Sequence, residues 1–198
     1  KTAYEIRLSL VGSEMCIRDS IKHMAVCDAN YIRLLKLIPQ LKFYRNQVMN
    51  SSHDRVLNID DGSKVAGLNL IDAQKSLQGI KKEICVADVL DTGEAVTVEL
   101  EVFETFKYTN TLKIIQKPEL TELVKNPVML VRVYHDASTA EVISSQGHSN
   151  FQSRYPEINP MMYHSDEKKQ VNIFLGEWLS LCLDVGRSAV LPELVIKP

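Results

Sequence analysis

The side chains best able to do chemistry lie in one short stretch, VRVYHDASTAEV, at residues 131–142. This stretch predicts two strands joined by a tight turn whose centre lies just after Asp136. That centre places Arg132 directly opposite Glu141 and puts Tyr134 on the same face of the hairpin. Such a face offers a charged and aromatic floor for an anionic or polar ligand. The simpler alternative is a cross-strand ion pair on a solvated face, which contributes about 0.2–1 kcal/mol.

Two histidines, His135 and His164, suggest a second kind of chemistry. Imidazole and carboxylate groups act as general acids and bases, and they also bind zinc, manganese and iron. No two histidines of the sequence have the spacing that puts both on one face of a helix. His135 and Asp136 are neighbours at the hairpin tip, where adjacent side chains diverge. A His/carboxylate site would take its carboxylate from Asp136, Glu141 or Asp166, and we assign no metal to it.

A loop after the hairpin adds two polar candidates. Arg154 and Tyr155 precede Pro156, where they can contact a ligand or hold the loop against the sheet. The sequence contains no G-x-S-x-G motif, no Walker loop and no G-x-G-x-x-G motif, so we assign neither a catalytic residue nor a cofactor. The candidate binding residues are Arg132, Tyr134, His135, Asp136, Glu141, Arg154, Tyr155, His164 and Asp166.

Two amphipathic helices bound the region that carries these residues. Over residues 24–38, apolar side chains recur every three or four positions, which predicts a helix that Pro39 ends. The same spacing over residues 166–185 predicts a long C-terminal helix. Cys27 and Cys182 fall on the apolar faces of these helices, where a buried thiol is an inert hydrophobe.

The ends of the C-terminal helix carry their own signals. Ser165 is the expected N-cap, because its hydroxyl can accept a hydrogen bond from the first turn. Gly186 stands where a left-handed C-terminal cap belongs. Trp178 shares the apolar stripe and is expected in the core rather than in a stacking site for a ligand.

The residues between the two helices predict β-structure. Over residues 96–102, apolar and polar side chains alternate, which predicts a strand with one face in water. The strands predicted are 56–59, 65–70, 84–90, 96–102, 112–114, 128–135 and 139–145, with a loop at 51–54 and a turn at 60–63. We therefore predict an α+β fold. An antiparallel sheet of about four to six strands would have an N-terminal helix and a long C-terminal helix packed on one face.

The composition excludes two classes of partner. The chain of 198 residues has 23 Lys and Arg against 25 Asp and Glu, so it lacks the basic surplus of a general nucleic-acid binder. No apolar run reaches the length of about 18 residues that a membrane-spanning helix needs. Cysteines at 27, 85 and 182 form no C-x-x-C motif and favour a reducing cytoplasm. The expected partner is therefore an unknown protein or small-molecule ligand, with no nucleic acid and no membrane.

The first 20 residues are interpreted as foreign to the protein. Lys1–Ile6 back-translates into the end of a flow-cell primer, and Leu10–Ser20 into a transposase adapter, in one frame and in the right order. Residues 7–9 fill the space that a sample index would occupy. Because such segments are left out of fold reasoning, we expect residues 1–20 to be an adapter-derived artefact and residues 21–198 to form a single α+β domain.

Several segments resemble a known family, the YqiB-like proteins. The segments that carry the resemblance are VRVYHDASTAEV, SRYPEINPMMYHSDEKKQVNIFLGEWLSLCL, CDANY through Leu37-Ile38-Pro39, and residues 104–116. These are small cytoplasmic proteins of gammaproteobacteria, grouped as a domain of unknown function. The resemblance covers residues 24–39 and about 100–186, and it implies a bacterial, cytoplasmic, single-domain α+β protein. It implies no activity, cofactor or catalytic residue.

The function predicted is a non-enzymatic binding or regulatory module in the bacterial cytoplasm. It would use the open face of the sheet and the hairpin tip at residues 135–138. The alternative is a small hydrolase or lyase with a His/carboxylate site around His135 and His164, with or without a metal. That alternative requires both histidines and a carboxylate to converge within hydrogen-bond reach in a concave pocket.

Overall fold

The structure, a computed structural model, describes residues 3–57, 64–87, 95–117, 127–146 and 166–188. The helices are α1 (Ala3–Leu37), α2 (Pro39–Leu57), α3 (Lys64–Leu77) and α4 (Glu167–Asp184). The strands are β1 (Lys81–Ala87), β2 (Val96–Thr105), β3 (Thr109–Lys117), β4 (Val128–Tyr134), β5 (Thr139–Ser145) and β6 (Arg187–Ser188).

The strands form one antiparallel sheet in the order β5-β4-β3-β2-β1-β6. The first five strands pair with their neighbours in the sequence, and the short β6 returns from α4 to the outer edge of β1. β6 contributes two pairs, Ile84 with Ser188 and Cys85 with Arg187. The predicted α+β class and the antiparallel sheet are confirmed, with the sheet at the upper end of the expected size.

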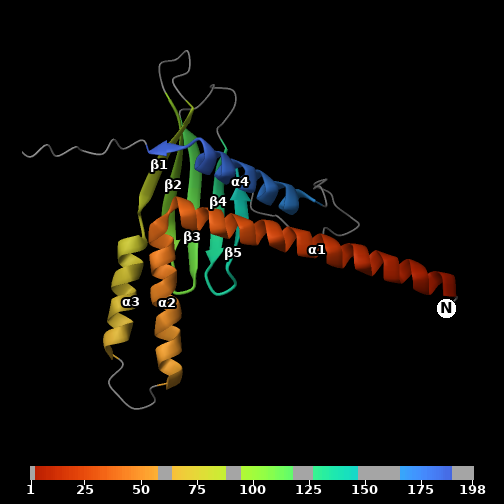
Figure 1. Cartoon of the computed structure of the whole chain (residues 1–198), viewed down its shortest axis with the longest axis horizontal. Coiled ribbons are helices and arrows are strands. Elements are labelled where there is room, and N and C mark those ends of the chain that lie inside the picture. Colours follow the sequence, from red (N-terminus) through yellow and green to blue (C-terminus); the bar gives the residue numbers. More distant parts are fainter. Residues whose placement is uncertain (1–2, 58–63, 88–94, 118–126, 147–165, 189–198) are drawn as a thin grey trace, which may run out of the picture.

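Two helices cross one face of the sheet side by side, as Figure 1 shows for α1 and α4. The outer part of α1 extends past the sheet toward the N-terminus, while α2 and α3 pair with each other at the opposite end. α1 ends at Leu37, and Pro39 takes the first position of α2, where its missing N–H is no loss. The predicted helix end at Pro39 is confirmed. Within the described segments, no helix has an apolar stretch long enough to cross a membrane.

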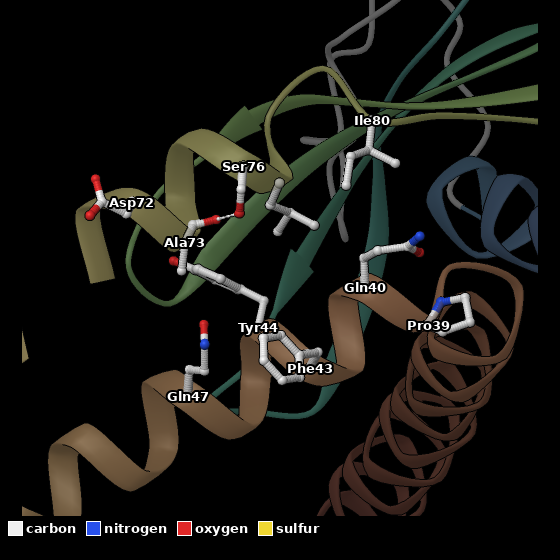
Figure 2. A pocket seen from close by; sticks show the side chains of 10 residues that line it. Pro39, Gln40, Phe43, Tyr44, Gln47, Asp72, Ala73, Ser76 and Ile80 are labelled. Carbon is white, nitrogen blue, oxygen red and sulfur yellow. Dashed lines mark hydrogen bonds between the residues drawn. The ribbon is translucent and has the colours of Figure 1, made fainter. Parts of the chain in front are cut away.

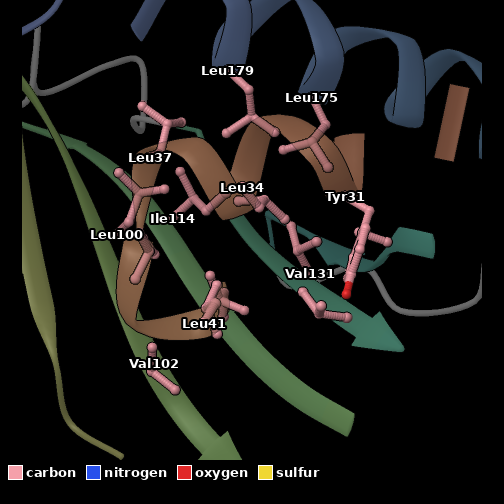
Figure 3. Packing of buried hydrophobic residues seen from close by; sticks show 14 of the residues in the cluster. Tyr31, Leu34, Leu37, Leu41, Leu100, Val102, Ile114, Val131, Leu175 and Leu179 are labelled. Atoms are coloured by element: carbon pink, nitrogen blue, oxygen red, sulfur yellow. The ribbon is translucent and has the colours of Figure 1, made fainter. Parts of the chain in front are cut away.

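The core lies between the sheet and the helices, and Figure 3 shows its centre. Along β4, buried and half-buried residues alternate, so every second side chain points into this layer. Side chains from α1, α2, β2, β3, β4 and α4 all meet there. Its fully or nearly fully buried members include Leu34, Leu41, Leu100, Val102, Ile114, Val131, Leu175 and Leu179. Burial of each such side chain contributes about 1.5–3 kcal/mol relative to exposure, before the entropy of ordering it.

A polar joint holds α1, α4 and the edge strand β5 together. Asn172 is fully buried on α4, and its Oδ1 accepts a hydrogen bond from the backbone N of Val142 at 3.0 Å. Its Nδ2 donates to the carbonyl of Lys168 at 2.8 Å, while its own carbonyl accepts from Asn30 of α1 at 2.9 Å. The joint therefore gives the backbone N–H of Val142, at the sheet edge, an acceptor. Without Asn172 this donor would be buried and unpaired.

The strands predicted at 56–59 and 65–70 and the loop predicted at 51–54 are wrong. Residues 51–57 belong to α2, and residues 65–70 belong to α3, while the turn predicted at 60–63 lies outside the described residues. The helical signal was present in the buried side chains of each helix. These lie three or four positions apart: Leu41, Tyr44 and Val48 in α2, and Leu70, the half-buried Ala73 and Leu77 in α3.

The predicted extent of the C-terminal helix is confirmed within a residue at each end. Its caps differ from the prediction. Asp166, rather than Ser165, takes the N-cap position, and its side chain makes no capping hydrogen bond. Gly186 is not in the left-handed conformation that was expected, which among the described glycines belongs to Gly79. A Cβ on Gly186 would lie 2.1 Å from the carbonyl oxygen of Cys182, so glycine is needed for close approach instead.

Candidate functional site

The β4–β5 hairpin has the predicted register. Arg132 pairs with Glu141 and Tyr134 pairs with Thr139, so the turn is centred just after Asp136 as expected. Arg132, Tyr134 and Glu141 are half-buried on one face, while the alternate residues of both strands point into the core. The predicted gathering of these three side chains is therefore present in the structure.

The Glu141 carboxylate has partners that the sequence did not indicate. Lys168 at the start of α4 places its Nζ 2.8 Å from Glu141 Oε2, and the Tyr134 hydroxyl donates to Oε1 at 3.2 Å. The side chains of Lys168 and Glu141 are each 25% exposed. Burial, followed by the Glu141 charge, raises the pKa of Tyr134 above its ordinary value. Asp166, exposed at the N-cap position of α4, stands two residues before Lys168.

Further acids and bases pair with one another on β1, β2 and β3. Glu99 is almost buried, and its carboxylate contacts the ammonium groups of Lys117 and Lys81. The hydrogen bond from Lys117 holds the pKa of Glu99 below its ordinary value despite burial. Lys81 also lies 3.3 Å from Glu101. Acids and bases in these rows therefore satisfy one another, which favours a solvated face over a ligand site.

His135 does not lie at an exposed hairpin tip, contrary to the sequence interpretation. The period of two along β4 turns it inward, and it has no exposed surface. Its Nε2 bonds to the Oδ1 of Asn110, and its Nδ1 lies 3.2 Å from the hydroxyl of Tyr31. Because an amide oxygen only accepts, Nε2 carries the proton and Nδ1 accepts from Tyr31. The ring of Tyr44 packs edge-on at 5.7 Å.

The surroundings of His135 keep it neutral. Burial, followed by the positive charge of Arg45, lowers the pKa of His135 from 6.5 to about 4, and the charge of Asp136 opposes this weakly. Arg45 donates to the hydroxyl of Ser138 at 3.1 Å, which ties α2 to the hairpin turn. Asp136 itself is exposed. His135 is therefore placed as a buried structural histidine rather than as a proton carrier.

Arg154, Tyr155 and His164 lie outside the described residues, so their roles stay predictions. In the segments that the structure does describe, no three His, Cys, Asp or Glu side chains are grouped to hold a metal ion. Cys27 and Cys182 are buried free thiols, and burial raises the pKa of each to about 11. Both cysteines thus match the expected inert role.

A groove between α2 and α3 is a concave feature that sequence reasoning missed (Figure 2). Its volume is about 820 Å³, within the range typical of ligand sites. Figure 2 shows Phe43 and Tyr44 on the α2 side and Ala73 and Ser76 on the α3 side. The lining residues are Pro39, Gln40, Phe43, Tyr44, Gln47, Asp72, Ala73, Ser76, Leu77 and Ile80.

Both walls of the groove are fixed to the sheet. The Tyr44 hydroxyl, in the α2 wall, lies 2.9 Å from the carbonyl of Phe106 and 3.2 Å from that of Lys107 in the β2–β3 turn. At the end of α3, the backbone N of Gly79 donates to Val102 of β2 at 2.8 Å, and Ile80 accepts from the same residue at 2.9 Å. The groove is therefore formed before anything binds in it.

The lining is mostly apolar, with three neutral polar side chains, Gln40, Gln47 and Ser76, and one charged residue. Phe43 is 66% exposed although it is a large apolar side chain. Asp72 is the one residue among the ten lining residues that carries a charge at neutral pH. The hydroxyl of Ser76 donates to the carbonyl of Ala73 at 2.9 Å, so it is already engaged. Such a surface recognises apolar groups and offers little for acid–base or nucleophilic chemistry.

The sequence profile of a family described as "Protein of unknown function (DUF1249)" matches residues 69–188, more than half of the chain. The chain belongs to the DUF1249 family. It is similar to the uncharacterised protein YqiB of Escherichia coli K12, with 41% identity over 91 residues. That match covers 46% of this chain and 65% of YqiB, so the chain spans just under two thirds of this relative. YqiB from strain O157:H7 matches equally, and no solved structure matches.

The DUF1249 match begins inside α3 and ends at β6. It therefore contains the whole sheet, α4 and the α3 wall of the groove, while α1 and α2 precede it. The resemblance to YqiB-like proteins predicted from the sequence is confirmed. The family description states no activity, so function must be argued from the site.

Proposed function

We propose that this chain is a non-enzymatic binding module that takes an extended apolar segment of a partner protein in the groove between α2 and α3. The observation that carries this proposal is the preformed groove of about 820 Å³ with the exposed ring of Phe43 in its wall. Aromatic side chains in concave surfaces are typical anchors of protein interfaces. Burying Phe43 against a partner would remove an apolar surface that now faces water.

The shape of the groove favours an extended segment over a helix. A helix with its side chains is about 10–12 Å across, whereas the axes of two packed helices lie about 8–10 Å apart. α2 and α3 are in contact with each other, so we expect the space between their lining side chains to suit an extended segment better than a helix. The charge of Asp72 favours a segment that also carries a basic residue.

A displayed library of random peptides about twelve residues long tests this proposal. We expect enriched peptides with several apolar residues and a Lys or Arg, and a loss of at least tenfold in their affinity for Phe43→Asp. The matched control is Phe106→Asp, because Phe106 is 57% exposed but does not line the groove. An absence of enriched peptides, or peptides that bind Phe43→Asp as well as the unaltered chain, would overturn the proposal.

A second candidate is a small anionic or polar ligand bound by Arg132, Tyr134 and Glu141. Lys168 adds a partly exposed cation from α4 to the predicted row, and an anionic ligand would share this cation with Glu141. Titration with inorganic phosphate and with succinate, followed by amide NMR shifts, tests it. Saturable shifts around Arg132 that Arg132→Gln removes would support this candidate, and unchanged spectra would reject it.

The hydrolase or lyase alternative now depends on His164. Both ring nitrogens of His135 are engaged and the ring is buried, so His135 offers no open position for a substrate or a metal. A cytoplasmic location is also part of our proposal, and the free thiols of Cys27, Cys85 and Cys182 support it.

A further inference from the structure

We infer that the outer face of α1 and α4, on the side of these helices opposite the sheet, is a surface on which a second copy of the chain packs. The face is formed by the outward side chains of residues 22–36 in α1 and 170–184 in α4. It is separate from the groove between α2 and α3, so this inference goes beyond the proposed function and does not depend on it. All of its residues follow the 20 that are interpreted as foreign to the protein.

The two helices lie side by side and run in the same direction, from the side of the N-terminus toward β1 (Figure 1). Asn30 of α1 fixes their relative level. Its Nδ2 donates to the carbonyl of Asn172 at 2.9 Å, and a Cβ on Gly176 would lie 2.8 Å from its Oδ1. Three residues further along α1, Arg33 is therefore level with Glu177 of α4. Positions along one helix can thus be matched to positions along the other.

The outer face has an apolar centre. A second groove, of about 620 Å³, lies there between the helices, and its lining includes Val26, Ala29, Ile173 and Leu181. Leu181 is 46% exposed, and Ile32, on the outward side of α1, is 54% exposed. The alanine allows a neighbouring helix to approach closely, and the larger side chains would then lose their contact with water.

Opposite charges are separated between the two helices on this face. Lys22, Arg33 and Lys36 give α1 three cations, and Glu177 and Asp184 give α4 two carboxylates. At about 100° per residue, these positions point away from the buried stripe of each helix. Within the described ranges, none of the five forms an ion pair with an acid or base of its own chain. A face with a basic strip beside an acidic strip is complementary to a second copy of itself.

The symmetry of the pair follows from the direction of the helices. A two-fold axis parallel to them places α1 of each copy over α4 of the other. Such a rotation preserves the level along the helices, so Arg33 would face Glu177 of the second copy, and Lys36 would lie between its Glu177 and Asp184. Each contact occurs twice, because the two halves of a two-fold interface are identical. A two-fold axis across the helices would instead place α1 over α1, with cations opposed.

The size of the face fits a weak dimer. Fifteen residues of helix rise about 22 Å, and two packed helices with their side chains are about 20 Å wide. The face of one copy therefore measures roughly 450 Å², and two faces together measure roughly 900 Å². This area is close to the lower limit of about 1,000 Å² for specific interfaces. We expect a dissociation constant of about 10–100 μM.

Sedimentation equilibrium of the full chain, at concentrations from about 10 μM to about 1 mM, tests the inference. We expect the unaltered chain to dimerise. Arg33→Glu and Glu177→Arg should each weaken the dimer at least about tenfold, because each opposes like charges at both symmetric contacts. An equimolar mixture of these two variants should dimerise again, since both contacts of the mixed pair join opposite charges. Lys42→Glu, at an exposed position of α2, changes the net charge as Arg33→Glu does and should have no effect.

Three outcomes would overturn the inference. These are a chain that stays monomeric up to about 1 mM, a dimer that neither variant weakens, and weakened dimers that mixing does not restore. Circular dichroism checks that each variant folds, and Lys36→Glu, at an exposed position, replaces a variant that does not. This substitution should also weaken the dimer, so an unchanged dimer would again overturn the inference.

Discussion

Two neighbouring regions of this molecule use opposite chemistry. Around His135, polar side chains from α1, α2, β3 and the β4–β5 turn are buried or half-buried and bonded to one another. In the groove between α2 and α3, the wall is preformed, apolar and open to water. Tyr44 belongs to both regions, since its ring packs on His135 and also lines the groove. The closed region is filled by its own side chains, whereas the open one presents its lining to water.

The difference teaches how position and recognition are divided in this fold. Buried hydrogen bonds have strict geometry, so the cluster around His135 fixes where α2 stands on the sheet. Apolar contacts have little direction, so the groove that α2 borders can accept a range of apolar sequences. The hydrogen-bonded cluster around His135 would thus support binding by holding the α2 wall of the groove in place, without itself contacting the bound segment.

The largest effect should come from removing the buried ring. His135→Ala leaves a cavity and removes partners from Tyr31 and Asn110, so we expect a loss of about 3–5 kcal/mol in the free energy of unfolding. Asp136→Ala, the adjacent but exposed residue, should cost less than about 0.5 kcal/mol. Urea denaturation followed by circular dichroism measures both. Similar small losses in the two variants would show that the closed region does not hold the fold.

The second effect is on acid stability. The unfolded chain has the ordinary His pKa of 6.5, whereas the folded His135 has a pKa of about 4, so the unfolded state binds more protons between these values. Stability from this group is complete above pH 6.5 and falls by about 3 kcal/mol as the pH drops to about 4. Unfolding free energies measured at several pH values in unaltered chain and His135→Ala should converge in acid. Carboxylates such as Glu99 affect both proteins alike, so parallel curves would contradict the assignment.

The register of the β4–β5 hairpin and the inward position of His135 could be predicted from the sequence, whereas the groove between α2 and α3 could not. In the β4–β5 hairpin, the turn residues and the period of two determine the register, because a one-residue slip would expose the core face. The same period also placed His135 on the core side, since it follows the outward Tyr134. The chemistry expected of a histidine next to an aspartate obscured that simpler signal.

The groove could not be read in the same way because it depends on tertiary packing. Val65 and Ile59 have β-branched side chains, which favoured strands over residues 56–70. Packing of α2 and α3 on each other, of α2 on α1 and of α3 on β2 overrides that weak preference. The contact between Lys168 and Glu141 likewise depends on where α4 packs, because the two residues are 27 positions apart in the sequence. Contacts between distant elements are therefore what local patterns leave undetermined.

A smaller effect tests the residue that both regions share. Tyr44→Phe keeps the ring against His135 and in the groove, but it removes the hydroxyl that reaches the carbonyls of Phe106 and Lys107. We expect a loss of about 1 kcal/mol in unfolding free energy. Peptides selected on the groove should also bind more weakly, because the wall is held less firmly. Ser180→Ala, which removes a local bond within α4 from the Ser180 hydroxyl to the carbonyl of Gly176 at 2.8 Å, lies outside the lining of the groove between α2 and α3, so it is the control and should change neither quantity measurably.

The smallest change in the free energy of unfolding is expected for Phe43, the residue whose substitution should weaken peptide binding most. Phe43 is exposed and, unlike the core side chains, gains little from folding, so Phe43→Ser should change unfolding free energy by less than about 0.5 kcal/mol. Phe106→Ser should do the same. The two variants should differ only in peptide affinity, because one ring lines the groove and the other does not. If Phe43→Ser instead cost as much stability as a core substitution, its ring would be packing against the protein itself, and the groove would be part of the closed region.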